Sequence, residues 1–174
     1  MAPPLNIIVI NSKKNEDFND NHRRLIAKIA PICIAYDFHL ILANFQISDT
    51  PVNFAKEIAP ATSIGSSGEK LINLAQKGKL QITDLPLGTN FGKVIICTSK
   101  PNKDKSTDIN IIADLSQKNK IALVFGTDEI RNKSIKKLSE NSDYHCDISK
   151  KNIKLELDTE IGAIASIIHK IRTT

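Results

Sequence analysis

Short apolar runs alternate with longer polar and amphipathic stretches along this chain. Runs of strand length occupy residues 6–10, 38–43, 94–97 and 121–125, and a more mixed strand-like segment follows at 144–148. A run that is apolar at nearly every position predicts a strand buried on both faces, as in a parallel sheet. The intervening stretches carry apolar residues at helical spacing. The pattern therefore predicts an α/β fold, with a mostly parallel sheet flanked by helices.

Helices are predicted over residues 51–58, 69–77, 108–115 and 131–138, with a first helix from about residue 19 and a last one from about residue 159. Pro31 is predicted to shorten or kink the first helix. The last helix is the best defined, because its apolar residues recur on one face, and Asp158 or Thr159 is available as its N-cap. Its apolar residues are Ile161, Ile164, Ala165, Ile168 and Ile171.

Polar segments follow the later strands at their carboxyl ends, where ligands bind in open α/β sheets. Residues 98–105 follow one strand and form either a site lining or a mobile surface connection, and Gly126 ends the next strand. Carboxylates near these ends could hold ribose hydroxyls or orient an amine, and their spacing specifies no metal site. They are Asp128, Glu129, Asp147, Glu156, Asp158 and Glu160.

Length and charge add further constraints. The 174 residues, 41% of them hydrophobic, are predicted to form one α/β domain spanning residues 1–174. The net charge of +5 favours an anionic partner, although a solvated basic surface explains it equally well. Cys33, Cys97 and Cys146 lie in apolar contexts without ligand spacing, so we expect reduced core thiols. No run has the character of a signal peptide or the length of a membrane span, which predicts a cytoplasmic protein.

Two residues at the start of the first predicted helix carry candidate chemistry. Arg24 could bind phosphate or assist the deprotonation of a hydroxyl, and His22 could exchange a proton near neutral pH or simply cap the helix. Basic stretches at residues 100–105 and 131–137 could contact phosphates or be hydrated surface. Unaided, the residues support a ligand-binding α/β domain with an anionic partner, and they name no reaction.

Several segments resemble an uncharacterised archaeal family of SPOUT-like proteins. They are residues 22–33 (HRRLIAKIAPIC), 35–38 (AYDF), 144–149 (YHCDIS), 155–156 (LE) and 161–164 (IGAI). The resemblance implies a carboxyl-terminal trefoil knot, a cofactor-binding region at about residues 94–172, and S-adenosylmethionine bound there in a bent shape. It also implies a homodimer, and the apolar face of the last helix could serve such an interface.

Carried over by position, the resemblance assigns the cofactor to the loops at 98–101, 126–129 and 148–155. The cofactor-binding residues would be Thr98, Ser99, Gly126, Thr127, Ile148, Lys154 and Leu155. The candidate catalytic residues are Arg24, which corresponds loosely to an arginine that many such enzymes direct at the target ribose, and His22. The candidate RNA-binding residues are Lys100, Lys103, Lys105, Arg131 and Lys133. The chain departs from the family pattern at Lys28, Asp37, Arg131, Asn132 and residues 155–158.

The leading hypothesis from the sequence is an S-adenosylmethionine-dependent RNA methyltransferase of SPOUT type that acts on tRNA or rRNA. One alternative is a non-catalytic RNA-binding module that retains the fold. Another is a small-molecule α/β enzyme without a nucleic-acid substrate. Cofactor binding separates the first from the second, and salt-sensitive RNA binding separates both from the third.

Overall fold

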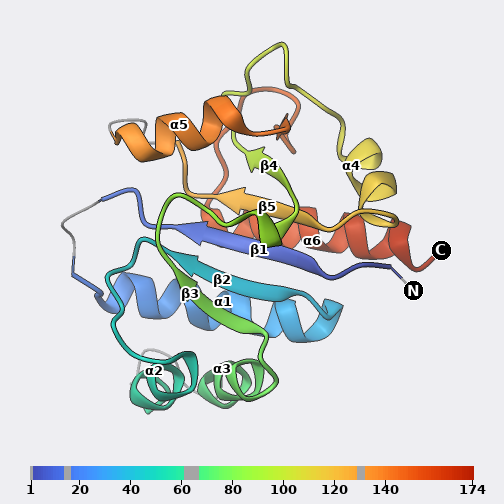
Figure 1. Cartoon of the computed structure of the whole chain (residues 1–174). Coiled ribbons are helices and arrows are strands. Elements are labelled where there is room, and N and C mark those ends of the chain that lie inside the picture. The colour runs from blue at the N-terminus through green and yellow to red at the C-terminus, as the bar shows by residue number, and fades with distance from the viewer. Residues whose placement is uncertain (1, 14–16, 61–66, 129–131) are drawn as a thin grey trace.

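In the part of the chain that the structure describes, six parallel strands form a single sheet in the order β3-β2-β1-β5-β4-β6 (Figure 1). The structure is a computed structural model that describes residues 2–13, 17–60, 67–128 and 132–174. The strands are β1 (Leu5–Ile10), β2 (His39–Ala43), β3 (Leu80–Thr83), β4 (Lys93–Cys97), β5 (Ile121–Phe125) and β6 (Tyr144–Cys146). β1 and β5 are adjacent at the centre, and every residue of both is buried. The predicted α/β class with a mostly parallel sheet is confirmed.

β3 is the strand that the apolar pattern missed. Among the described strands it pairs with β2 alone and lies at one end of the sheet, where three of its four residues are partly exposed. A four-residue edge strand needs no continuous apolar run, so residues 80–83 alternate apolar and polar side chains instead.

The helices are α1 (Asp20–Tyr36), α2 (Pro51–Ile58), α3 (Ser67–Gln76), α4 (Ile109–Ser116), α5 (Lys133–Asn141) and α6 (Leu157–Arg172), with a short 3₁₀ helix at Thr89–Phe91. α1 continues past Pro31, so the predicted shortening is wrong. Buried residues on both sides of the proline, Ala30 and Cys33, hold the helix against the core and outweigh the missing hydrogen bond.

The structure defines the C-terminal end of α1 and corrects the predicted start of α6. α1 stops at Asp37, whose φ of 59° is the left-handed conformation that suits glycine, the residue that the resemblance predicts there. α6 begins at Leu157, with Glu156 as an N-cap that makes no side-chain capping bond. Asp158 and Thr159 therefore lie inside the first turn, and the predicted N-cap is wrong.

The two faces of the sheet are covered unequally. α1, α2, α3, α4 and α6 pack on one face around the larger core, whereas α5 and the segment before β4 cover the other (Figure 1). Ile161, Ile164 and Ile168 of α6 are completely buried within this one chain, where α6 packs against α1 and α4. The apolar face of the last helix is therefore not available for a partner subunit.

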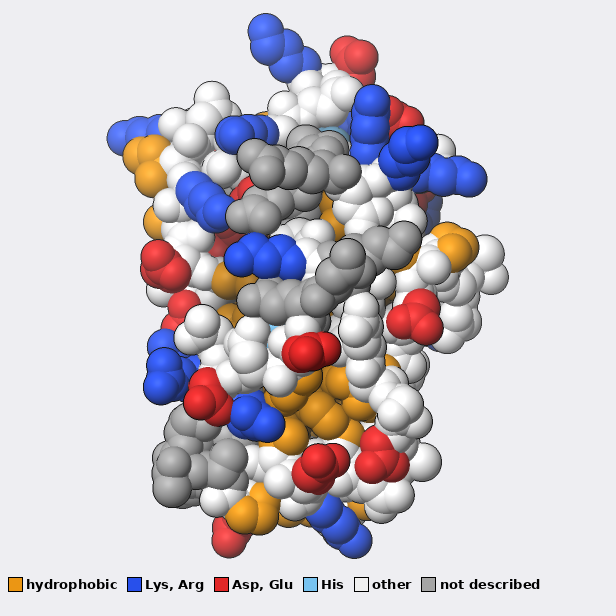
Figure 2. Space-filling view, turned by 90° about the vertical axis from the view of Figure 1, so that its left-hand side faces the viewer, with side chains coloured by type: hydrophobic (Ala, Val, Ile, Leu, Met, Phe, Trp, Pro, Cys, Tyr) orange, Lys and Arg blue, Asp and Glu red, His pale blue; other side chains and the backbone are white. Residues whose placement is uncertain are grey.

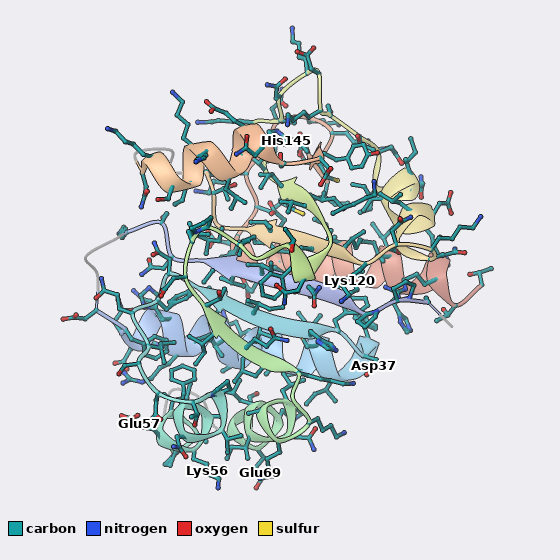
Figure 3. The ribbon with its side chains drawn as sticks, viewed as in Figure 1. Asp37, Lys56, Glu57, Glu69, Lys120 and His145 are labelled. Atoms are coloured by element: carbon teal, nitrogen blue, oxygen red, sulfur yellow. The ribbon has the colours of Figure 1, made fainter. Side chains whose placement is uncertain are left out.

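One segment of chain lies on both sides of β6. The Thr98 N–H at the end of β4 donates to the Cys146 carbonyl over 2.9 Å, and the Thr107 N–H donates to the His145 carbonyl over 2.8 Å. Residues 98–107 thus leave β4 and return along the outer side of β6, where Ser106 bridges His145. The His145 ring, shown near α5 and this loop in Figure 3, fixes the arrangement because its Nδ1 accepts the Asn102 N–H over 2.9 Å.

Two further sequence predictions have a structural outcome. All three cysteines are free and buried, as expected for reduced core thiols. Within the described ranges, no helix combines the length and the apolar character needed to cross a membrane.

Candidate functional site

A cavity of about 460 Å³ lies at the carboxyl edge of the sheet. It is formed where β1 and β5 end and where the last loop enters α6, so two of the three predicted loops meet there. Its lining residues are Ser12, Gly126, Asp128, Lys154, Leu155, Glu156, Leu157 and Glu160. This combination of carboxylates, one lysine, a hydroxyl and two leucines suits a polar ligand with an apolar part.

Gly126 allows the close approach of two chain segments beside this cavity. Its φ is 90°, and a Cβ atom there would lie 2.5 Å from the carbonyl oxygen of Ile10. A side chain would therefore meet both an unfavourable backbone conformation and the main chain at the end of β1. The glycine lets the chain leave β5 sharply and place residues 126–128 along the cavity.

The third predicted loop reaches the cavity through one hydrogen bond. The Thr98 hydroxyl donates to Asp128 Oδ1 over 2.5 Å and itself accepts the Lys100 N–H over 3.1 Å. Thr98 is buried, as are Ser99 and Thr127, and none of the three lines the cavity. Ile148 packs against the larger core instead. Among the predicted cofactor residues, Gly126, Lys154 and Leu155 are the ones that line the cavity.

Glu160 is the most unusual side chain in the cavity wall. Only 6% of it is exposed, and its carboxyl group has no hydrogen bond to any part of the chain that the structure describes. Burial raises its pKa to about 7, and the nearby carboxylates of Asp128 and Asp147 add to the effect, whereas Lys154 opposes it. A buried carboxyl group of this kind is typical of functional sites.

The position of Glu160 in the sequence already indicates burial, although the prediction places it only among six carboxylates near the strand ends. Glu160 precedes Ile164 by four residues and Ile168 by eight, so the helical period places it on the apolar face of α6. An acidic residue on a buried helix face requires a partner or a function.

The two candidate catalytic residues lie near the start of α1, and the structure brings neither into the lining of the cavity. The backbone N–H of Asn19 donates to His22 Nδ1 over 3.2 Å, and Asn19 Oδ1 accepts the His22 N–H over 3.2 Å, which completes a capping box. The His22 ring also lies 5.1 Å from the ring of Phe45. Arg24 is exposed. A catalytic role for either residue stays a prediction.

The predicted RNA-binding lysines differ in their surroundings. Lys100, Lys103 and Lys133 are exposed, whereas the Lys105 ammonium group donates to the carbonyl oxygens of Glu140 and Ser142 near the end of α5. Arg131 lies outside the described residues. Figure 2 shows Lys and Arg side chains gathered over the upper half of the carboxyl edge, in the region of α5 and the loop after β4.

Comparison with protein families gives a match over almost the whole chain. The family described as "Protein of unknown function (DUF531)" matches residues 5–169. The chain belongs to the DUF531 family. A relative of this DUF531 protein is the "Uncharacterized protein MJ0224" of Methanocaldococcus jannaschii, which is 34% identical over 165 residues, covering 95% of this chain and 93% of that protein.

Several solved structures share the fold of the DUF531 protein. A probable methylase family protein from Haemophilus influenzae Rd KW20 matches 96% of this chain with a TM-score of 0.62 at 16% identity. This chain spans 64% of that protein's length. TrmJ from Z. mobilis ZM4 matches 97% of this chain and 69% of its own, with a TM-score of 0.60 at 12% identity.

A third similar structure is the TrmH/SpoU tRNA modifying enzyme from A. aeolicus, which matches 97% of this chain and 75% of its own, with a TM-score of 0.55 at 16% identity. At these identities the likeness establishes the fold alone. Together with the family match and the relative from Methanocaldococcus jannaschii, it confirms the resemblance to an uncharacterised family with a SPOUT-like fold.

Proposed function

We propose that this DUF531 protein is an S-adenosylmethionine-dependent RNA methyltransferase of SPOUT type that acts on tRNA or rRNA. The observation that carries the proposal is the cavity at the carboxyl edge, lined by residues after β5 and before α6, on a fold shared with RNA-modifying enzymes. An exposed basic region lies on the same edge (Figure 2), and basic surfaces attract the phosphate backbone of RNA.

The residues of the cavity fit S-adenosylmethionine. Its volume of about 460 Å³ falls within the range of roughly 300–1,000 Å³ that is usual for small-ligand pockets. Lys154 can pair with the carboxylate of the ligand, the two leucines can contact apolar parts, and the backbone at Gly126 can approach closely. When bound, S-adenosylmethionine supplies a methyl group activated on a positively charged sulfur. The part of the protein is to hold the acceptor atom in line with that methyl group.

Arg24→Ala is expected to reduce methyl transfer by about 100-fold or more, because the guanidinium fork positions the RNA acceptor. Cofactor affinity should stay within about twofold of wild type, since Arg24 does not line the cavity. Arg24→Lys keeps the charge and loses the planar fork, so it should also be impaired. The measurement is tritiated methyl transfer to tRNA and rRNA from a matching host, beside cofactor titration.

Lys28→Ala is the matched control, because it removes one positive charge from the next turn of the same helix. Lys28 is exposed, and its ammonium nitrogen lies 3.4 Å from Oδ2 of Asp158. We expect Lys28→Ala to retain methyl transfer. Full activity in Arg24→Ala would remove the role assigned to that residue.

The second candidate function is a non-catalytic RNA-binding module. It is favoured by the engagement of His22 in the helix cap and the aromatic cluster, which leaves no free histidine base at that position. Wild-type protein that binds RNA with a steep salt dependence, without methyl transfer or cofactor binding, would support the module. Lys100, Lys103 and Lys133 are the exposed lysines through which such binding would act.

The proposal includes a trefoil knot and a homodimer. The hydrogen bonds of residues 98–107 along both sides of β6 support the knot, because they place one loop on either side of a strand that follows it in the chain. Exposed Ile34 of α1, rather than the buried face of α6, is an apolar side chain that a partner could cover. Sedimentation at micromolar concentration should give a species of twice 19.2 kDa. A monomer throughout the concentration range would contradict the homodimer.

A further inference from the structure

Glu160 is a buried acidic residue that has no hydrogen-bond partner for its carboxyl group among the described residues. Only 6% of the residue is exposed, and it lines the cavity. An ionised carboxylate in such a place is unstable unless a positive charge or several donors approach it. Lys154 is the cation that shares the cavity wall.

The surroundings of Glu160 make the cavity attractive to cations. Asp128 after β5 and Glu156 at the start of α6 line the cavity with Glu160, and the negative charge of Asp147 after β6 also acts on its carboxyl group. Burial raises the pKa of Cys146 to about 12 and that of Cys97 far above its usual value, so both nearby thiols stay neutral. Among the described residues, no group of three His, Cys, Asp or Glu side chains could hold a metal ion. An organic cation is therefore the occupant that the chemistry favours.

We propose that Glu160 is the carboxyl group that recognises the positive charge of the ligand in this cavity, and that it releases a proton when the ligand binds. The inference rests on the proposed function, because S-adenosylmethionine carries both a sulfonium and an ammonium group. S-adenosylhomocysteine keeps only the ammonium group, and methylthioadenosine carries neither. The three compounds therefore form a series in which charge decreases while the adenosine part is retained.

The number of protons released on ligand binding can be measured, and it tests the proposal independently of methyl transfer. The free protein holds a proton on Glu160 below a pKa of about 7, and a bound cation favours the ionised form. Binding of S-adenosylmethionine should thus release about 0.9 proton at pH 6 and about 0.1 at pH 8. Affinity should rise with pH by up to about tenfold per unit below pH 7 and then level off.

The test is isothermal titration calorimetry of the full chain with each of the three compounds, at pH 6 and pH 8, in buffers of different ionisation enthalpy. Glu160→Gln should weaken S-adenosylmethionine and S-adenosylhomocysteine by about tenfold or more at pH 8 and abolish the proton release. It should leave methylthioadenosine within about twofold of wild type. Asp158→Asn is the control, because it removes a carboxylate from the same first turn outside the cavity.

Each contrary outcome has a distinct meaning. Equal weakening of all three compounds would show that Glu160 only shapes the cavity, and unchanged affinity for all three would overturn the proposal directly. Unchanged affinity with loss of methyl transfer would instead make Glu160 a proton acceptor from RNA and overturn the role in cation recognition. Failure of wild type to bind any of the three would overturn the proposed cofactor, and this inference with it.

Discussion

Glu160→Gln is expected to stabilise the protein, by an amount that grows by about 3 kcal/mol between pH 4 and pH 8. The folded state holds the Glu160 proton up to about pH 7, whereas the unfolded chain loses it near 4.5. Over that window the folded state binds the additional proton, so wild-type stability falls as pH rises. Glutamine does not titrate and is free of this loss.

Urea denaturation of both proteins across this pH range measures the effect, and the difference between them cancels the titration of other groups. Asp158→Asn serves as the control, since Asp158 is a half-buried acidic residue of the same helical turn that pairs with Lys28. It should show no comparable trend. A difference between wild type and Glu160→Gln that stays constant with pH would mean that Glu160 titrates normally and is not buried as described. Glu160 lowers the stability of the folded protein at neutral pH, and a destabilising residue of this kind is expected where function requires it.

Gly126→Ala is expected to destabilise the protein by about 3 kcal/mol or more, and to abolish ligand binding at the cavity. The new Cβ atom would lie 2.5 Å from the carbonyl oxygen of Ile10, and the backbone φ is 90°. Neither β1 nor β5 can move aside easily, because both are central, fully buried strands. The strain should therefore displace the turn that lines the cavity.

Gly78→Ala separates the two causes of this loss. Gly78 also has a positive φ, of 71°, but a Cβ atom there would have no neighbour within 4 Å. Its cost should be limited to the backbone term, about 1 kcal/mol. Denaturant unfolding of both variants gives the comparison. Equal losses at the two positions would contradict the close approach at Gly126.

The sequence predicted the parts of the fold that burial dictates. Central strands such as residues 121–125 are apolar at every position because both faces are covered, and that pattern is visible without coordinates. β3 was missed because an edge strand of four residues does not require an apolar side chain at every position. The continuation of α1 past Pro31 was missed because a proline disfavours a helix locally, and the buried packing of Ala30 and Cys33 overrides that preference.

The sequence predicted where the cavity lies, and it predicted fewer of the residues that line it. Apolar strands that end in polar turns locate the carboxyl edge, and Gly126, Lys154 and Leu155 do meet there. Which other side chains enter the cavity depends on the exact rotation of α6 and on the turn after β5, and local patterns do not specify either. Glu160 is the example, since its helical period indicates a buried face, but only the fold shows that this face opens into a cavity.

The most direct test of the central claim is a crystal structure of the protein grown with S-adenosylhomocysteine. We expect the ligand in the cavity between Gly126 and Glu160, beside Lys154, and the chain of β6 passing through the loop of residues 98–107. A cavity that stays empty at saturating ligand, or a ligand bound elsewhere on the molecule, would contradict the assignment of this protein as an S-adenosylmethionine-dependent methyltransferase.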